Sequence, residues 1–596
     1  MPSPCGHRAA ECCASICCIS LPGISDIAAT SSSSSRSDFV ISAISALFPN
    51  TQFTNHESLP SFSDSFSTFA EAFPHYLETM PQADEIREAE YPHLSNHICL
   101  DYSGVGLFSH SQIRNLSSSA SSPRFFTISY KSASLKFDAQ NGEQEAGFES
   151  SVKKKIMAFL KISADDYFMV CTSNRTTAFS LVAETYPFQS NDRLLTVYDY
   201  ESEAVTPMSE CAQRRGAKVM SASFTWPSLG IHLARLKRML GSRSKKKKRG
   251  LFVFPLMSRM TGTRYPNLLI KMAQERGWHV ALDTCTLGPK DMDTMGMALL
   301  QPDFIICSFF KVFGLNPSGF AGLFIRKSSQ EVLRSSVLDR SIGLVAIVPA
   351  RSNSSHSGEE DMETRSFSGP LSSTQNAGTK YEEGEASEKR ELPSEIVEED
   401  QEADNLDQEA EIELRGLHHA DSLGLPVIQI RLRCIINWLV IALMKLRHPD
   451  SSHGDCLVRI YGPNVRFDRG SAIAFNLFDW KGEKVEPSLV QKLADRSNIS
   501  LNCGFLQNIW LSDHKHGQYR HGGLEKKGPG TGVLGRRRKK ETGDLGIAVV
   551  SASLAFLVNF EDAYRFWAFV AKFLDADFVE KERWRYVALN QRSMEI

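Results

Sequence analysis

Residues 306–314 read Ile-Cys-Ser-Phe-Phe-Lys-Val-Phe-Gly and place one lysine, Lys311, among apolar and aromatic side chains. The apolar run 304–307 before it is typical of a buried β-strand, so Lys311 follows the end of that strand. A buried ammonium group is costly unless it is paired or neutral, and burial lowers its pKa. The neutral amine is the form that attacks an aldehyde to give an imine. We therefore favour a reactive Lys311 over a surface lysine whose stem packs on the protein.

Short apolar runs alternate with helix-length segments on the N-terminal side of this lysine. The spacing of roughly 25 to 50 residues is typical of an α/β domain with a mainly parallel sheet. In such a sheet, ligands bind beyond the carboxyl ends of the strands. The expected strands are 98–100, 167–171, 194–198, 251–254, 280–282 and 304–307.

Composition divides the 596 residues into four segments. Residues 1–75 are rich in Ser and Cys and are expected to be a disordered extension. Residues 76–337 carry the large α/β domain, and residues 338–415 are expected to be an acidic, disordered insertion. Residues 416–596 predict a C-terminal helix and a smaller α+β domain, interrupted by a basic, Gly-rich loop at 514–543.

Charge and cysteine content narrow the function classes. Lys and Arg total 67 and Asp and Glu total 69, which gives no reason to expect nucleic-acid binding. No apolar run approaches the roughly 20 residues of a membrane span, so no membrane contact is expected. The 13 cysteines lack the spacing of a metal site and suit a reducing, cytoplasmic location. Glu11 and Asp26 weaken the alternative of a plastid transit peptide.

Polar residues follow three of the other expected strands. Residues 171–178 form a turn into a helix, whose N–H groups suit a phosphate, although an ordinary helix cap is the preferred interpretation of this segment alone. Asp283 ends its strand, where it either meets a cation such as a protonated pyridine nitrogen or caps the next turn. Arg259 and Arg264 follow a further strand and could bind an anion. Each segment alone is a weak signal.

Together, in the order phosphate turn, Asp and Ser-x-x-Lys, these segments resemble fold-type I pyridoxal-phosphate enzymes of the class V aminotransferase and cysteine-desulfurase group. The likeness is closest to the molybdenum cofactor sulfurases and covers about 97–337 and 416–575. It implies a large α/β/α domain with a small α+β domain, pyridoxal 5'-phosphate as cofactor, a homodimer, and a small amino-acid substrate such as L-cysteine. The stretches that carry it are 100–104, 172–178, 259–266, 308–314, 474–479 and 559–563.

The resemblance also implies a role for individual residues. Lys311 would form the Schiff base with the cofactor, and Asp283 would pair with the pyridine nitrogen and keep it protonated. The backbone groups of Arg175 and Thr176, together with Ser308, would hold the phosphate.

Several positions depart from the pattern of the group. Tyr200 stands where a histidine usually stacks on the cofactor ring, and a tyrosine can stack but is no imidazole proton carrier. Arg259 stands where an asparagine usually contacts the ring hydroxyl. In the loop 501–508 both cysteines of the sulfurase pattern are absent, and Cys503 would replace the sulfur acceptor only if the loop shifts. Ser551 stands where an arginine should bind the substrate carboxylate.

Two alternatives to a sulfurase-like enzyme therefore stay open. One is a pyridoxal-phosphate-fold scaffold or regulatory protein without desulfurase activity, with the acidic insertion as its interaction surface. The other is a different pyridoxal-phosphate lyase or transaminase, which needs no persulfide cysteine.

Overall fold

The computed structural model describes residues 38, 40–43, 45–49, 51–101, 110, 126–131, 147–241, 250–284, 300–309, 319–334, 343–349, 414–449, 456–466, 469–510, 525–526 and 545–594. Most of the expected N-terminal extension, acidic insertion and basic loop lie outside the described residues, as does Lys311.

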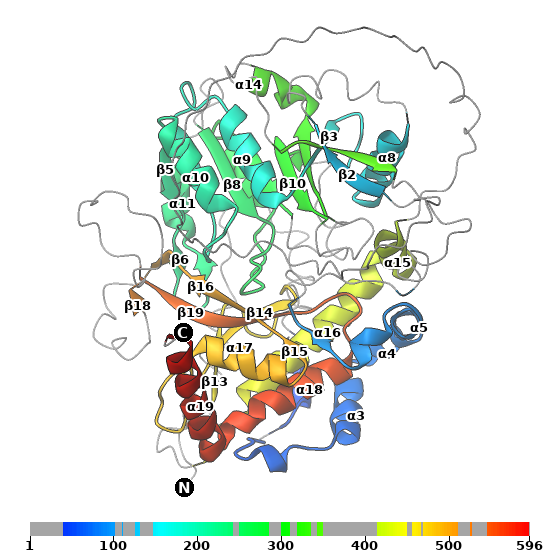
Figure 1. Cartoon of the computed structure of the whole chain (residues 1–596), viewed down its shortest axis with the longest axis vertical. Helices are drawn as coiled ribbons and strands as arrows, with labels where there is room; N and C mark the ends of the chain where they lie inside the picture. The colour runs from blue at the N-terminus through cyan, green and yellow to red at the C-terminus, as the bar shows by residue number, and fades with distance from the viewer. Residues whose placement is uncertain are drawn as a thin grey trace, which may run out of the picture.

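A seven-stranded sheet forms the centre of the large domain, in the upper half of Figure 1. Neighbouring strands are parallel except at β11, which runs antiparallel to both β10 and β3. The expected α/β class, with a mainly parallel large sheet, is confirmed. In sheet order the strands are β3 (Tyr167–Thr172), β11 (Ala321–Arg326), β10 (Phe304–Ser308), β9 (Trp278–Asp283), β8 (Gly250–Pro255), β4 (Arg193–Thr196) and β5 (Lys218–Ser221).

The central strands are apolar because both of their faces are covered. Every residue of β8, β9 and β10 is buried, as expected for strands of a parallel sheet packed between helices. Among the covering helices, α9 packs against β10 and β11, and α12 packs against β9. The described helices of this domain are α8 (Phe148–Phe159), α9 (Arg175–Thr185), α10 (Val205–Arg214), α11 (Leu233–Leu240), α12 (Leu268–Gln274) and α14 (Gln330–Arg334).

Two small sheets flank the large one. β2 (Phe126–Tyr130) pairs antiparallel with β12 (Val345–Pro349), so residues 345–349, which were expected to belong to the acidic insertion, form a strand. β6 (Phe224–Thr225) lies between β7 (Gly230–Ile231) and β17 (Ile509–Trp510). The pairing of β6 with β17 joins the large domain to the C-terminal part of the chain.

The small domain is built on an antiparallel sheet in the lower half of Figure 1. Its strand order is β13 (Val458–Tyr461), β14 (Ala472–Leu477), β19 (Leu545–Ser553) and β16 (Asn502–Leu506), and β18 (Glu525–Lys526) pairs with the end of β19. The helices are α15 (Arg415–Leu423), α16 (Leu425–Met444), α17 (Pro487–Arg496), α18 (Phe560–Ala571) and α19 (Ala576–Met594).

The helix expected after Pro426 is present as α16. By length and composition, its residues Pro426–Met444 would suffice to cross a membrane, the one such helix in the described part of the chain. However, 72% of that window is buried inside the protein, and α16 packs against α18, α15 and β13. These contacts are those of a central helix in a folded domain.

For the described residues 51–75, the prediction of a disordered extension does not agree with the structure. α3 (Phe62–Ala72) is capped by Ser61 and is followed by α4 (Pro74–Leu77) and α5 (Met80–Glu90). These helices pack against α16 and α18 of the small domain. Phe62, Phe66, Phe69 and Phe73 recur at helical spacing within the Ser-rich segment, and this aromatic stripe outweighs its polar composition.

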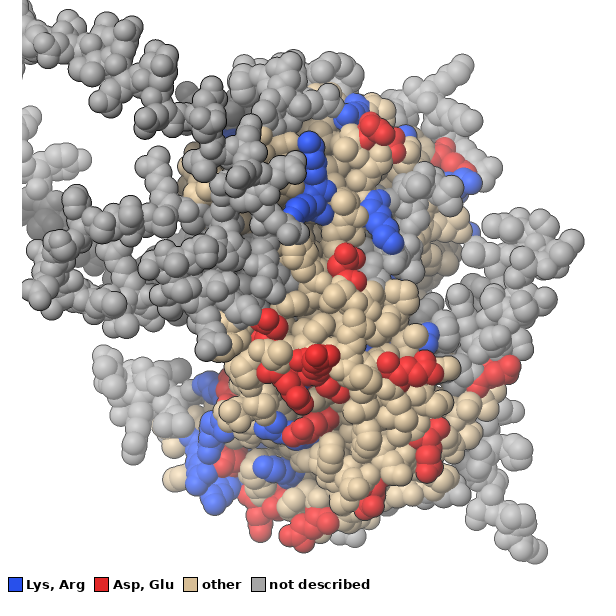
Figure 2. Space-filling model, turned by 90° about the vertical axis from the view of Figure 1, so that its right-hand side faces the viewer, with Lys and Arg blue, Asp and Glu red and all other residues tan. Residues whose placement is uncertain are grey.

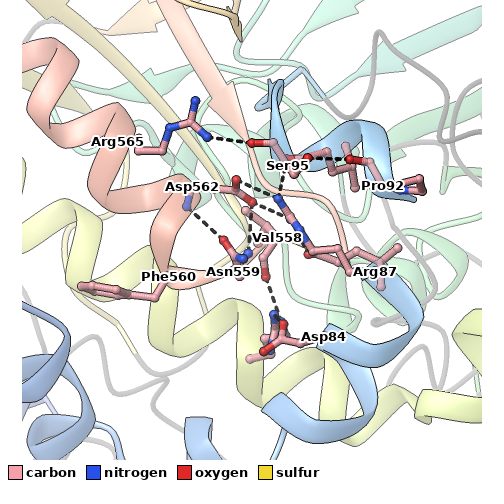
Figure 3. A network of polar contacts seen from close by, with 12 residues as sticks. Asp84, Arg87, Pro92, Ser95, Val558, Asn559, Phe560, Asp562 and Arg565 are labelled. Carbon is pink, nitrogen blue, oxygen red and sulfur yellow. Dashed lines mark hydrogen bonds and ion pairs between the residues drawn. The ribbon is translucent and has the colours of Figure 1, made fainter. Parts of the chain in front are cut away.

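A buried ion pair locks the N-terminal helices to the small domain (Figure 3). Both terminal nitrogens of Arg87 donate to Asp562, over 2.7 and 3.0 Å, and also to the carbonyl oxygens of Leu557 and Leu94. Asp562 in turn completes the capping box of α18 with Asn559. The nearby strand β1 (Ile98–Cys99) pairs with β15 (Ile499–Ser500) of the small domain, not with the large sheet as its apolar sequence led us to expect.

The side of the molecule that carries α4, α5 and α15 exposes acidic side chains over its lower half (Figure 2). Glu71, Glu78, Glu85 and Glu88 of the N-terminal helices are exposed. The single arginine of these helices, Arg87, is turned inward to Asp562.

Candidate functional site

Asp283 lies at the carboxyl edge of the large sheet, at the end of β9, with no exposed surface. Its Oδ2 atom accepts a hydrogen bond from the Arg175 guanidinium over 2.6 Å and another from the Tyr198 hydroxyl over 2.9 Å. Burial, followed by the charge of Asp283, raises the pKa of Tyr198 well above its ordinary value. Asp283 is therefore a buried carboxylate with a cationic partner, as such a group requires.

The first turn of α9 faces the same edge, because β3 leads directly into it. Asn174 caps the helix: its side-chain oxygen accepts from the backbone N–H of Thr177 over 2.9 Å. Arg175 and Thr176 are the first two residues of the helix. The turn therefore contains the ordinary helix cap that the sequence allowed. The other N–H groups of the first turn point toward the edge of the sheet, as a phosphate site needs.

Ser308 ends β10 beside this edge and is 8% exposed. Its neighbour Ile306 stands in register with Asp283 across the parallel pair. The two sequence segments singled out at 280–283 and 306–308 therefore meet in space, as predicted. Lys311 follows three residues after the end of β10.

Tyr200 is the residue that the sequence predicts to stack on the cofactor ring. It is 2% exposed, and its ring centroid lies 5.8 Å from that of Tyr198. Its hydroxyl group is buried without a hydrogen-bond partner in the described part of the chain. Burial raises its pKa to about 12, and the Arg175 charge opposes this rise. A buried hydroxyl without a partner suggests that a further polar group belongs next to it.

The small domain holds the backbone around Tyr200 in place. Tyr200 forms a β-bridge with Leu506, and the Gln507 backbone N–H donates to the Asp199 carbonyl over 2.8 Å. The Asn508 side chain donates to the Tyr198 carbonyl over 3.1 Å. The loop 501–508, which was expected to carry the sulfur acceptor, therefore fixes the backbone on both sides of Tyr200.

Asp199 is a buried carboxylate that the sequence analysis missed. It accepts hydrogen bonds from Ser258 over 2.7 Å and from Thr261 over 2.8 Å. Burial raises its pKa to about 6, although these hydroxyl groups oppose the rise. Asp199 thereby ties the segment of Tyr200 to the loop that carries Arg259. Hydroxyl residues at 258 and 261 were the available signal, but nothing in their spacing indicates a shared partner.

Arg259 lies in that loop and is half-buried. Its positive charge opposes the rise of the Tyr200 pKa. The loop is held from the small domain: Ser553 donates to the Arg259 carbonyl over 3.4 Å, and Ser551 donates to the Met260 carbonyl over 3.2 Å. Ser551, at the position of the missing carboxylate-binding arginine, thus contacts protein backbone.

Cys503 belongs to a different face of the small domain. A Cβ atom at Gly504 would lie 2.4 Å from the Met260 side chain, so position 504 faces the large domain. Adjacent strand residues point to opposite faces, and the Cys503 thiol accordingly donates to the Pro487 carbonyl at the start of α17 over 3.4 Å. Burial raises its pKa to about 11. The thiolate is the reactive form of cysteine, and this environment suppresses it.

No site for a metal ion accompanies these residues. Within the described ranges, no three His, Cys, Asp or Glu side chains gather closely enough to hold one.

Comparison with known proteins extends the resemblance over most of the chain. The chain is 23% identical over 484 residues to molybdenum cofactor sulfurase of Danio rerio, covering 77% of the chain and 51% of that protein. The Homo sapiens sulfurase is 24% identical over 446 residues, which covers 71% of this chain and 44% of that protein. The Solanum lycopersicum sulfurase is 26% identical over 294 residues, which covers 44% of this chain and 34% of that protein. The chain thus spans about half the length of these relatives or less. No family model matches. The predicted resemblance to molybdenum cofactor sulfurases is confirmed.

Solved structures of similar shape include two cysteine desulfurases. The apo enzyme of Thermococcus onnurineus has a TM-score of 0.49 and 14% identity, and it covers 82% of this chain and 98% of its own. CsdA of Escherichia coli has a TM-score of 0.47 and 17% identity, with coverage of 83% and 98%.

Proposed function

We propose that this chain, which is similar to molybdenum cofactor sulfurases, is a pyridoxal-phosphate-dependent enzyme of the class V type that acts on a small amino acid. The observation that carries the proposal is the fully buried carboxylate of Asp283 at the carboxyl edge of the sheet, with Ser308 and the start of α9 on the same edge. This edge is where α/β folds bind ligands.

The described residues fit the cofactor. Asp283 offers a buried negative charge to a protonated ring nitrogen, and Tyr200 offers a buried aromatic face with a hydroxyl that lacks a partner among the described residues. The first turn of α9, with Thr176, and the Ser308 hydroxyl offer hydrogen-bond donors to a phosphate.

Pyridoxal 5'-phosphate, when bound, supplies an electron-withdrawing ring that stabilises negative charge at the α-carbon of an amino acid. The role of Asp283 is to hold a proton on the ring nitrogen, since its buried charge favours the cation. Tyr200 would offer its buried aromatic face to the ring and keep water away from it. Arg259, in the loop that Asp199 ties to the Tyr200 segment, adds a positive charge that would attract an anionic group of cofactor or substrate.

L-Cysteine is the proposed substrate, because the chain is similar to molybdenum cofactor sulfurases. Transfer of its sulfur to Cys503 is the weakest part of that proposal, because the thiol faces α17 and its pKa is raised. This observation favours a second candidate function, a pyridoxal-phosphate lyase or transaminase without a persulfide cysteine. A homodimer and a cytoplasmic location stay predictions.

Reconstitution tests the proposal. Purified protein should bind pyridoxal 5'-phosphate with a change in visible absorbance, and borohydride should fix the cofactor to Lys311, located by peptide mass. Lys311→Ala should lose the covalent attachment. Sulfide release from L-cysteine by the wild type and by Cys503→Ala then separates the two candidates: release that needs Cys503 supports sulfur transfer, and pyruvate or keto-acid formation without it supports the second. Absence of any cofactor binding would contradict both and favour a scaffold.

A further inference from the structure

Arg175 already occupies the carboxylate that the cofactor would use. The guanidinium lies 2.6 Å from Asp283, and the two side chains are 15% and 0% exposed. The same carboxylate oxygen also accepts from Tyr198. In this protein the negative charge of Asp283 is therefore balanced by a side chain of its own chain.

A guanidinium and a protonated pyridine ring are competitors for one carboxylate. Each brings a positive charge and an N–H donor, and a site without exposed surface screens two like charges poorly. Asp283 carries one negative charge and can neutralise only one of them. Full pairing with Arg175 therefore excludes full pairing with a ring nitrogen.

We propose that Arg175 is an internal counter-ion of Asp283, which the ring nitrogen of pyridoxal 5'-phosphate must displace when it binds. This inference rests on the proposed function. It makes Arg175 a residue that sets the cofactor affinity through its side chain, in addition to any contact of its backbone with the phosphate.

The surroundings of Arg175 allow the displacement. Its guanidinium lies 5.2 Å from the centre of the Phe179 ring and 3.4 Å from the Ser202 hydroxyl. Both contacts can remain when the guanidinium leaves Asp283, the first by cation–π attraction and the second by a hydrogen bond. Because Arg175 is the first residue of α9, a rotation at the end of its side chain suffices and the helix can stay where it is.

The proposal predicts the sign of an affinity change. When the binding-competent state is only a fraction of the population, the apparent affinity falls by that fraction. Removing the competing charge should therefore tighten binding of pyridoxal 5'-phosphate, by roughly tenfold or more if Asp283 is mostly occupied. If Arg175 instead helps to hold the cofactor, its removal should weaken binding.

The test is a titration of apo-protein with pyridoxal 5'-phosphate, followed by absorbance, in the wild type, Arg175→Met and Arg175→Gln. Methionine keeps an apolar stem against Phe179, and glutamine keeps a donor without the charge, so one of the two should fold even if the other does not. Thermal unfolding of each apo-protein gives a readout independent of turnover. Both variants should lower the apo melting temperature, since Asp283 loses its counter-ion, and should enlarge the rise in melting temperature that the cofactor causes.

Arg87→Met is the matched control, because it also removes a buried arginine from an aspartate. It should lower the melting temperature without changing the cofactor dissociation constant. Equal or weaker binding by both Arg175 variants, with the wild type binding normally, overturns the counter-ion proposal alone. Failure of the wild type and of both variants to bind the cofactor overturns the proposed function and the inference with it.

Discussion

Two buried arginine–aspartate pairs in this protein are built for different purposes. Arg87 meets Asp562 through two nitrogens and two oxygens and fills its remaining donors with two carbonyl groups (Figure 3). Arg175 donates to Asp283 over 2.6 Å, with a ring face and a hydroxyl among its other neighbours. The first pair joins the N-terminal segment of Arg87 and Leu94 to the segment 557–562 of the small domain, whereas the second stands at the carboxyl edge of the large sheet and is the pair that we propose the cofactor exchanges.

The comparison predicts the largest loss of stability for the Arg87 pair. Arg87→Met leaves Asp562 buried without its cation and uncouples α5 from α18, so it should destabilise the protein by about 3–5 kcal/mol. Urea unfolding measures the change. The reverse variant, Asp562→Asn, should give a loss of similar size, and a loss below about 1 kcal/mol in both would mean that the pair is no clamp.

A smaller loss of stability, but a large loss of cofactor binding, is expected at the second pair. Asp283→Asn keeps the shape of the side chain and removes its charge, which leaves the partly exposed Arg175 without a counter-ion. We expect a destabilisation of about 1–3 kcal/mol, with cofactor affinity at least tenfold weaker because the ring nitrogen loses its anion. Absorbance titration and urea unfolding measure the two effects, and unchanged cofactor affinity would remove Asp283 from the site.

Asp199 adds a third case to the comparison of the two arginine–aspartate pairs. It is a buried carboxylate whose partners are hydroxyl groups and not an arginine. Its pKa rises from 3.8 to about 6 on folding, chiefly through burial. Between these values the folded state binds more protons than the unfolded state, so this group's contribution to stability is greatest below about pH 4 and is lost as the pH rises to about 6. The size is on the order of 1.4 kcal/mol per unit of pKa difference.

Asp199→Asn should remove that slope. Urea unfolding of the wild type and the variant at several pH values between 4 and 7 isolates it, since the other titrating groups are common to both proteins. The difference in unfolding free energy should shift in favour of the variant as the pH rises. A difference that stays constant over this range would mean that Asp199 remains ionised throughout.

The sequence revealed one side of the site better than the other. Asp283 and Ser308 were found because each ends an apolar run, and parallel strands bring such ends together. The partner of Asp283 was not found: Arg175 lies 108 positions away along the chain, and its sequence context indicated only a phosphate turn. The sequence motif does not predict the direction of the Arg175 side chain, and so it does not predict the pairing with Asp283.

The domain boundary shows a similar limit. Composition suggested an unstructured start through residue 75, but the helices α3 to α5 fold because distant surfaces on α16 and α18 cover their aromatic residues. Likewise β1 has the apolar sequence of a sheet strand, and only the pairing with β15 assigns it to the small domain. Local patterns predicted the elements, while partners remote in sequence decided where the elements belong.

The smallest effect is expected at Cys503, the one predicted site residue that lies on the α17 face of the small sheet. Its pKa of about 11 leaves it protonated at pH 8, so it should react with iodoacetamide far more slowly than the exposed Cys456. Peptide mass mapping compares the two labelling rates in one sample of folded protein.

Raising the pH to 9 should change the Cys503 labelling rate in proportion to its small thiolate fraction. As a control, Cys503→Ala should bind the cofactor as the wild type does. Labelling of Cys503 as fast as Cys456 at pH 8 would show that its strand opens toward solvent, and it would restore this thiol as a candidate sulfur acceptor.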